Sequence, residues 1–390
     1  MKAVHFGAGS IGRGFIGERL HFSGYEVTFI DVNDEIINQI NQNSGYSLYR
    51  IEDGYERVII DRCQAVSSVA EPDKAIQEIA EADIVTTSVL AGNLKHVAPV
   101  LLAGLRARHV NNKPRINVLA CENAVGNSQI LRQCMIDLDP TCADFIDVVA
   151  AFANTEVDRL VLASERDGER AIDIGREYEL AIDETQIVDG TKGLTEGATY
   201  TDQLEKYIER KLFIINGGHV WAGFIGHLRG YTVMQDVFAQ PELTQMVKQT
   251  MAECGALISQ KYGFTASEID AYIDFAVGRF MTPGIVDTVA RVCRSPIRKL
   301  KAHERLVSPA VQCAERGLNN ERLLQGIAAA FLYSNSEDQE SVELGNYVAS
   351  RGIEHAVPHF TGIEPGNGMY AKIVRFYDRF KKEGVSDLSF

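Results

Sequence analysis

The sequence lacks paired cysteines. Its 390 residues include seven cysteines, an odd number, spread from Cys63 to Cys313 without any Cys-x-x-Cys pair. A disulfide scaffold and a structural zinc site of the usual spacing are therefore not expected.

Apolar runs long enough for a membrane are missing too. No stretch approaches the ~20 apolar residues that span a bilayer. The opening MKAVHFGAGS does not show the charged region, apolar stretch and cleavage site of a signal peptide. Together with the scattered cysteines, this predicts a reduced, cytoplasmic, soluble protein with no membrane partner.

Basic residues are in deficit, with 39 Lys and Arg against 53 Asp and Glu and a net charge of −14. Such a surface repels phosphate backbones, so a nucleic-acid partner is not expected, and an anionic substrate needs a local basic pocket. The remaining composition is that of ordinary globular chains. At 390 residues the chain is longer than one core usually serves, which predicts two domains.

The first half of the chain alternates short apolar runs with amphipathic ones. Segments 2–6, 26–30, 84–89 and 116–120 are typical of buried strands, and 11–23 and 33–43 of helices. Alternating strands and helices predict a parallel sheet of βαβ units. Segment 46–66 is interpreted instead as a small antiparallel excursion.

From about Thr199 the sequence becomes a series of helical patterns, the longest at 201–228 and 241–262. We place a boundary near 190–200, where glycines supply loop chemistry. The fold class predicted is α/β, with a Rossmann-type doubly wound domain over 1–195 and an all-helical domain over 196–390. The site is expected in a cleft between them.

A glycine-rich turn follows the first predicted strand and matches the pattern Gly-x-Gly-x-x-Gly. The second predicted strand ends on Asp31, 19 residues after the last of these glycines. That context is typical of a dinucleotide turn, in which backbone N–H groups approach a pyrophosphate. Asp31 would accept hydrogen bonds from the adenosine ribose and repel a 2′-phosphate, which favours NAD over NADP. The predicted cofactor-binding residues of the turn are Gly7, Ala8, Gly9, Ser10, Ile11 and Gly12.

Two neighbours of this turn belong to the same hypothesis. The turn at Ser88-Val89-Leu90, after the strand predicted at 84–89, would bring Val89 under the cofactor's ribose. Arg13 is compatible with a place beside the pyrophosphate or with a surface cap.

The segment from Tyr207 to His219 carries the clearest chemistry. On a helix at ~100° per residue, Asn216 lies ~140° and His219 ~80° round from Lys211. A buried lysine of lowered pKa can take a hydroxyl proton as hydride leaves the carbon, and an amide N–H can stabilise the alkoxide. Two consecutive glycines, Gly217 and Gly218, indicate close packing against this helix. The alternative is a solvated helix face with a core histidine.

The motif Lys211-x4-Asn216-x2-His219 resembles the catalytic signature of the polyol-specific long-chain dehydrogenases and reductases, the mannitol dehydrogenase family. Two further stretches, FANTEVDRL at 152–160 and ACENA at 120–124, are similar to motifs of the same family. The resemblance extends over nearly the whole chain.

Within the family, the opening segment, YIERKLFIINGGH and the residues 294–300 resemble the branch that acts on polyol phosphates. The resemblance implies interconversion of D-mannitol 1-phosphate and D-fructose 6-phosphate with NAD and without a metal. It also implies that Lys211 is the general base, that Asn154 and Asn216 bind the alkoxide, and that His219 orients the substrate hydroxyls. Asn123 would lie near the nicotinamide or substrate, or would cap a turn.

The sequence departs from the family in places. Ser88-Val89-Leu90 stands where relatives have Ala-Val-Gly, and Asn-Gly-Gly-His stands where they have Asn-Thr-Gly-His.

Asp158 and Arg159, in the stretch 152–160, are interpreted as a structural pair that braces Asn154.

The segment 291–305, here called the basic segment, holds six Lys and Arg residues. Guanidinium groups suit phosphate oxygens, so the sugar phosphate is expected here, with Arg298 and Lys299 favoured. The alternative is a basic loop that neutralises nearby carboxylates.

Other functions remain open on the sequence. The same chemistry could serve an unphosphorylated polyol or a hexuronate, and a non-catalytic dinucleotide-binding regulator is a further alternative. A small-molecule sugar phosphate is the expected partner, and the chain is expected to be a monomer or homodimer.

Overall fold

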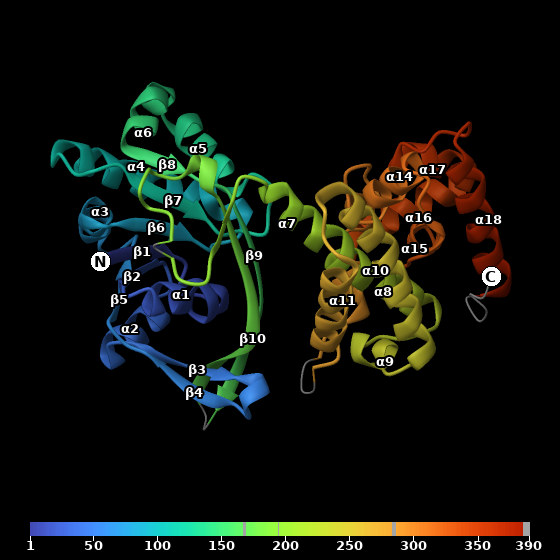
Figure 1. Ribbon diagram of the computed structural model, residues 1–390, viewed down its shortest axis with the longest axis horizontal. Coiled ribbons are helices and arrows are strands. Elements are labelled where there is room, and N and C mark those ends of the chain that lie inside the picture. Colours follow the sequence, from blue (N-terminus) through green and yellow to red (C-terminus); the bar gives the residue numbers. More distant parts are fainter. Residues whose placement is uncertain (167–168, 194, 283–285, 385–390) are drawn as a thin grey trace. The chain divides into compact units, whose positions relative to one another are not determined.

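The computed structural model describes residues 1–166, 169–193, 195–282 and 286–384 (Figure 1). The chain divides into two compact units, Met1–Tyr207, called unit 1, and Ile208–Phe390, called unit 2. Within the described residues, no helix combines the length and the apolar character that crossing a membrane requires.

Unit 1 is built on a six-stranded parallel sheet in the order β5-β2-β1-β6-β7-β8. The strand order reverses between β1 and β6, and this is the point at which doubly wound sheets bind their ligands. The doubly wound prediction for this half is confirmed. The strands are β1 (Lys2–Phe6), β2 (Glu26–Asp31), β5 (Cys63–Ser67), β6 (Ile84–Thr87), β7 (Ile116–Ala120) and β8 (Ala150–Phe152).

Successive side chains of a strand point to opposite faces of the sheet, and here both faces pack against other elements. On β1, Val4 and Phe6 share a core with α3 and α4, whereas Ala3 packs with the helix that follows the glycine turn. The helices of unit 1 are η1 (Gly12–Gly17, a π-helix), α1 (Glu18–Phe22), α2 (Asp34–Asn43), α3 (Pro72–Glu81), α4 (Leu94–Val110), α5 (Asn127–Leu138) and α6 (Ala143–Val149), with short 3-10 turns at Ile51–Asp53, Ala91–Asn93, Pro140–Cys142 and Glu184–Gln186.

A second sheet contains β3 (Tyr46–Arg50), β4 (Glu56–Ile60), β9 (Thr155–Arg166), β10 (Glu169–Asp183) and β11 (Thr199–Thr201). β3 and β4 pair antiparallel, as predicted, but β5 pairs parallel with β2, so extending the excursion to residue 66 was wrong. The long β9–β10 hairpin, drawn in green in Figure 1, was not foreseen. Its inward side chains pack on η1, where an added Cβ at Gly14 would lie 2.6 Å from Val161.

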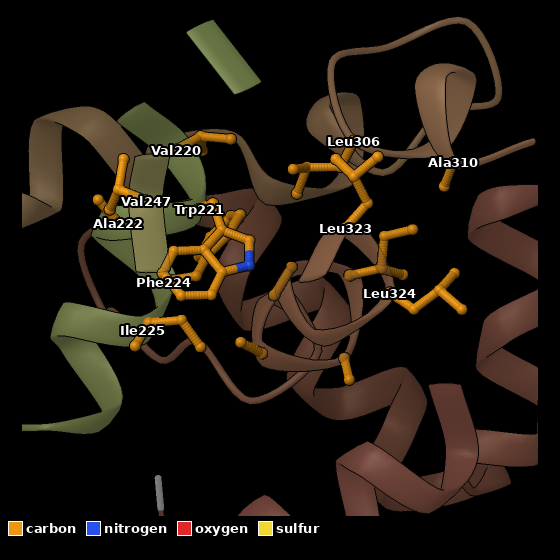
Figure 2. Packing of buried hydrophobic residues seen from close by; sticks show 14 of the residues in the cluster. Val220, Trp221, Ala222, Phe224, Ile225, Val247, Leu306, Ala310, Leu323 and Leu324 are labelled. Atoms are coloured by element: carbon orange, nitrogen blue, oxygen red, sulfur yellow. The ribbon is translucent and has the colours of Figure 1, made fainter. Parts of the chain in front are cut away.

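The described part of unit 2 is helical, apart from one isolated bridge between Val233 and Thr288, so the all-helical prediction is confirmed. Its core surrounds Trp221 (Figure 2). The indole N–H of Trp221 donates to the Arg322 carbonyl oxygen at 2.7 Å. Its helices are α7 (Leu204–Arg210, which begins in unit 1), η6 (Lys211–Asn216, a π-helix), α8 (Gly217–Leu228), α9 (Met234–Phe238), α10 (Pro241–Tyr262), α11 (Ala266–Phe280), α12 (Val289–Cys293), α13 (Pro296–Lys299), α14 (Val307–Glu315), α15 (Glu321–Ala330), α16 (Gln339–Arg351), α17 (Ile353–Thr361) and α18 (Gly368–Glu383).

Candidate functional site

The glycine turn of unit 1 connects β1 to η1. Gly7 has φ +99°, a conformation that favours glycine, and an added Cβ at Gly12 would lie 1.8 Å from the Gly7 carbonyl oxygen. An added Cβ at Gly9, by contrast, meets no atom of the described chain within 4 Å. The turn is therefore closely packed at Gly7 and Gly12 and open at Gly9, where a ligand can approach the backbone.

Asp31 at the end of β2 is tied to this turn. Its Oδ2 accepts from the Ala8 N–H at 2.6 Å, and its Oδ1 accepts from the N–H groups of Val32 and Asn33 at 2.7 and 2.9 Å. The carboxylate is half-buried and held in place before any ligand arrives.

Exposed apolar side chains gather in the loops that follow the parallel strands. One such side chain follows each of β1, β2, β5, β6 and β7. Exposed apolar side chains that gather on a surface are typical of a binding site. Together with the open Gly9 backbone and the fixed Asp31 carboxylate, they fit a dinucleotide, whose ring systems are apolar and whose pyrophosphate seeks backbone N–H groups. These exposed residues are Ile11, Val32, Val69, Leu90 and Val125.

The loop after β6 is held by a buried carboxylate that the sequence motif contained but did not explain. Glu122 accepts from the Val89 N–H at 2.9 Å and from the Thr87 hydroxyl at 2.8 Å. Burial raises the pKa of Glu122, against the lowering effect of these hydrogen bonds. The contact fixes Val89, which is half-buried, in the loop at the sheet's switch point.

Asn154 lies between β8 and β9, and its amide has a fixed orientation. Its Oδ1 accepts from the N–H groups of Ser128 and Gln129, at 3.1 and 3.4 Å, at the start of α5. Because both partners are backbone donors, Oδ1 is the end turned to the helix and Nδ2 is the other end. Asn154 therefore presents a hydrogen-bond donor. Asn123 is exposed in the turn between β7 and α5.

In unit 2, Lys211 and Asn216 are the first and last residues of the π-helix η6. The prediction treated this segment as an α-helix, and the assumed angle of about 140° between them was wrong for that reason. A π-helix bonds residue i to i+5, which brings side chains five apart nearer to one face. Lys211 is 7% exposed and Asn216 is half-buried.

His219 follows one turn later on α8. It stacks on Phe280 with ring centroids 4.1 Å apart, and its Nε2 lies 3.5 Å from Oδ2 of Asp287. Burial lowers the pKa of His219 to about 4, although Asp287 acts in the opposite direction. The imidazole is therefore neutral near pH 7. Arg291 forms two contacts of 2.5 Å with Asp287.

The packing expected at the two glycines of α8 is present. An added Cβ at Gly217 would lie 2.8 Å from the Arg305 carbonyl oxygen, and one at Gly218 would lie 2.4 Å from Met251. Arg305 of the basic segment therefore lies close to Gly217, the first residue of α8 and the one that follows Asn216.

The two favoured phosphate residues have different surroundings. Arg298 is exposed and pairs with Glu304 at 3.3 Å. Lys299 is buried and its amine donates to the Arg294 carbonyl. Burial, followed by Arg298 and Arg305, lowers the pKa of Lys299 to about 8. Arg305 pairs with Glu304 at 2.9 Å, so Arg298 and Arg305 share one carboxylate.

Two family models match the chain: the mannitol dehydrogenase Rossmann domain over residues 1–196 and the mannitol dehydrogenase C-terminal domain over 203–354. The chain belongs to the mannitol dehydrogenase family. The family resemblance predicted from the motifs is confirmed.

Curated members of the family are similar over nearly the full length. A mannitol-1-phosphate 5-dehydrogenase of Arthrobacter sp. (strain FB24) is 40% identical over 384 residues, covering 98% of this chain and 99% of its own. One of Exiguobacterium sp. (strain ATCC BAA-1283 / AT1b) is 39% identical over 388 residues, covering 98% of both.

Two solved structures share the fold. A substrate-free D-sorbitol dehydrogenase superposes with a TM-score of 0.84 at 16% identity, covering 98% of this chain and 94% of that one. A Pseudomonas fluorescens mannitol 2-dehydrogenase, in a ternary complex with NAD and D-mannitol, gives 0.74 at 16% identity, covering 98% and 92%. Over the described ranges, no group of three or more His, Cys, Asp or Glu side chains is placed to hold a metal ion.

Proposed function

We propose that this protein is an NAD-dependent oxidoreductase that interconverts D-mannitol 1-phosphate and D-fructose 6-phosphate. The observation that carries the proposal is the π-helical segment in which a buried lysine and an asparagine, Lys211 and Asn216, are brought toward one face. The substrate class is supported by full-length relatives that are named mannitol-1-phosphate 5-dehydrogenases.

The cofactor proposal is supported by the geometry of unit 1. Gly9 leaves the backbone open for a pyrophosphate, and Asp31 places a carboxylate where the ribose hydroxyls of the adenosine would bind. A 2′-phosphate would meet that negative charge, so NAD is preferred over NADP. When bound, NAD supplies the acceptor for the hydride that leaves the carbinol carbon.

The chain's own part in the reaction is to move one proton and stabilise one oxygen. Lys211 takes the proton of the reacting hydroxyl in the oxidation and returns it in the reduction. Asn154 and Asn216 donate hydrogen bonds to the oxygen as it becomes an alkoxide. His219, neutral at pH 7, accepts from or donates to a neighbouring substrate hydroxyl.

The phosphate is assigned to the basic segment. Arg298 offers an exposed guanidinium, and Lys299 adds a positive charge from inside the same turn. Asn123 is assigned to the nicotinamide or substrate side of the β7 turn.

The proposal also covers the cellular compartment and the oligomeric state. All seven cysteines are free thiols, six of them buried, which supports a reducing compartment such as the cytoplasm. We place the protein there as a monomer or homodimer.

The test measures NADH oxidation with fructose 6-phosphate, fructose and a hexuronate, for the wild type and for Lys211→Met. We expect the wild type to prefer the phosphorylated ketose. Lys211→Met should lose several orders of magnitude in kcat while NADH still binds, as followed by its fluorescence. A variant that keeps a tenth of wild-type turnover would mean that the base lies elsewhere.

Arg298→Ala gives the phosphate assignment its own comparison. Its KM for fructose 6-phosphate should rise, with little effect on the affinity for NADH. Faster turnover of fructose or of the hexuronate by the wild type would favour the sister activity on an unphosphorylated substrate.

A further inference from the structure

Asn127, the first residue of α5, has a side chain that is 0% exposed and fully engaged. Its Nδ2 donates to the carbonyl oxygens of Glu122 and Thr155, both at 3.0 Å, and contacts the Thr155 hydroxyl at 3.1 Å. Its Oδ1 accepts from the N–H groups of Thr155 and Ser128, at 3.1 and 2.9 Å. One amide thus joins three backbone segments.

Two of those segments carry a residue proposed for the reaction, and the third carries a group that orients one of them. Glu122 precedes Asn123 and fixes Val89, Thr155 follows Asn154, and the Ser128 N–H is the group that orients the Asn154 amide. The Ser128 hydroxyl strengthens the same junction, because it accepts from the Ala120 N–H at 2.8 Å and donates to the Ala153 carbonyl at 2.6 Å.

We propose that Asn127 is a positioning residue for the reaction, acting by holding the Asn154 amide and the Glu122–Asn123 turn in register. This rests on the proposed function, in which Asn154 donates to the reacting oxygen. Asn127 touches neither substrate nor cofactor in this proposal. Its effect passes through the backbone on either side of the donor.

Aspartate is the informative replacement, because it has the same shape and keeps the acceptor that serves Ser128 and Thr155. It replaces the donor Nδ2 with an oxygen that faces two carbonyl oxygens, Glu122 O and Thr155 O. These groups repel one another, so the two segments should separate while the rest of the unit stays folded.

Asn117, on β7, offers a control of the same residue type. It is 8% exposed, donates to the Thr191 hydroxyl at 2.8 Å and accepts from the Val188 N–H at 2.8 Å. It lies near the amino end of β7, whereas Glu122 follows the carboxyl end. Asn117→Asp therefore makes the same amide-to-carboxylate change at a position outside the proposed site.

The experiment compares wild type, Asn127→Asp and Asn117→Asp in fructose 6-phosphate reduction, well below the Tm of each. Displacement of a reacting group by ~1 Å costs up to about 100-fold in rate, so Asn127→Asp should lose at least about tenfold in kcat. Its affinity for NADH should change less, and the primary isotope effect with 4-deuterated NADH should rise as hydride transfer becomes slower. Asn117→Asp should keep the wild-type kcat and isotope effect.

A purely structural role predicts a different result: a lowered Tm for Asn127→Asp with unchanged kcat and isotope effect, which would overturn the proposal. A crystal structure of Asn127→Asp gives a readout that does not depend on the substrate. If Asn154 Oδ1 stays at its wild-type distance from the Ser128 N–H, the positioning role is wrong. Failure of the wild type to reduce any of the ketoses would instead count against the proposed function.

Discussion

Arg159 on β9 donates to the carboxylate of Glu18 on α1 at 2.6 Å, and both side chains are at most 2% exposed. The same guanidinium donates to the carbonyl oxygens of Gly175 and Gly14, at 2.9 and 3.2 Å. The long hairpin is thereby fastened to the helix that follows the glycine turn. The sequence interpretation had Arg159 bracing Asn154, whereas these contacts brace the dinucleotide helix.

Replacing Arg159 by Met should destabilise unit 1 strongly. It leaves the Glu18 carboxylate buried beside Arg19 alone, and removal of one partner of a buried ion pair costs about 3–5 kcal/mol. Urea unfolding at pH 7 measures the loss. Arg170→Met, on the neighbouring strand β10, is the control, since its pair with Glu35 at 3.1 Å is 64% exposed on the arginine side and 67% on the glutamate side and should contribute about 1 kcal/mol or less.

The pair also has a pH signature with a definite sign. Burial acts to raise the pKa of Glu18, but Arg159 and Arg19 outweigh it and the net shift is downward. Stability from a carboxyl of lowered pKa is present above its unfolded pKa of ~4.3 and is lost as the pH falls through the folded value. Below pH 4, wild type and Arg159→Met should therefore converge in free energy of unfolding. Parallel curves would contradict the assignment.

Leu90 has φ +73° and ψ 140°, which is a strained conformation for a leucine. Such a conformation costs about 1–3 kcal/mol, whereas glycine tolerates it at an entropy cost of about 0.5–1 kcal/mol. Leu90→Gly should stabilise the protein by about 1 kcal/mol against urea. Leu90→Ala keeps the strain and should show no such gain.

The strained backbone of Leu90 presents its side chain to solvent. It is 77% exposed in a loop at the switch point of the sheet. If it packs on a bound dinucleotide, Leu90→Gly should gain stability and lose affinity for NADH together. A Leu90→Gly variant that is no more stable than Leu90→Ala would show that the loop relaxes without glycine.

Much of this fold was predictable from local sequence, because its signals are local. The strands β1, β2, β6 and β7 are short, mostly buried runs rich in apolar residues, and the glycine turn with Asp31 has a fixed spacing. The β9–β10 hairpin was missed because its strands mix charged and apolar residues, and their pairing is decided by packing on η1. The site was predicted less completely for the same reason: Glu122 and Asn127 act through backbone groups distant in sequence, which no motif records.

Lys299 should give the stability of unit 2 an alkaline pH dependence. Its folded pKa is about 8, lowered by burial first, against a value of 10.5 for an ordinary lysine. Between these values the unfolded chain binds the extra proton, so stability rises with pH. Relative to Lys299→Met, the wild type should gain up to about 1.4 kcal/mol per pH unit in that range.

Urea unfolding from pH 7.5 to 10 measures this difference. Lys301→Met, at an exposed lysine two residues further on, controls for the loss of one positive charge. Wild-type and Lys299→Met curves that stay parallel over the whole range would show that folding does not lower the pKa of Lys299.

Asn154→Asp separates the structural role of this residue from its proposed chemistry. The carboxylate keeps the oxygen that accepts from Ser128 and Gln129, and negative charge is favourable at the start of a helix by about 0.3–1 kcal/mol. The Tm should therefore be unchanged or raised. The other end of the side chain changes from a donor to a charged acceptor, and loss of one such donor to a developing oxyanion costs about 100- to 1,000-fold in kcat. Asn154→Ala should lose both stability and kcat. If Asn154→Asp retains kcat within threefold, Nδ2 does not donate to the reacting oxygen.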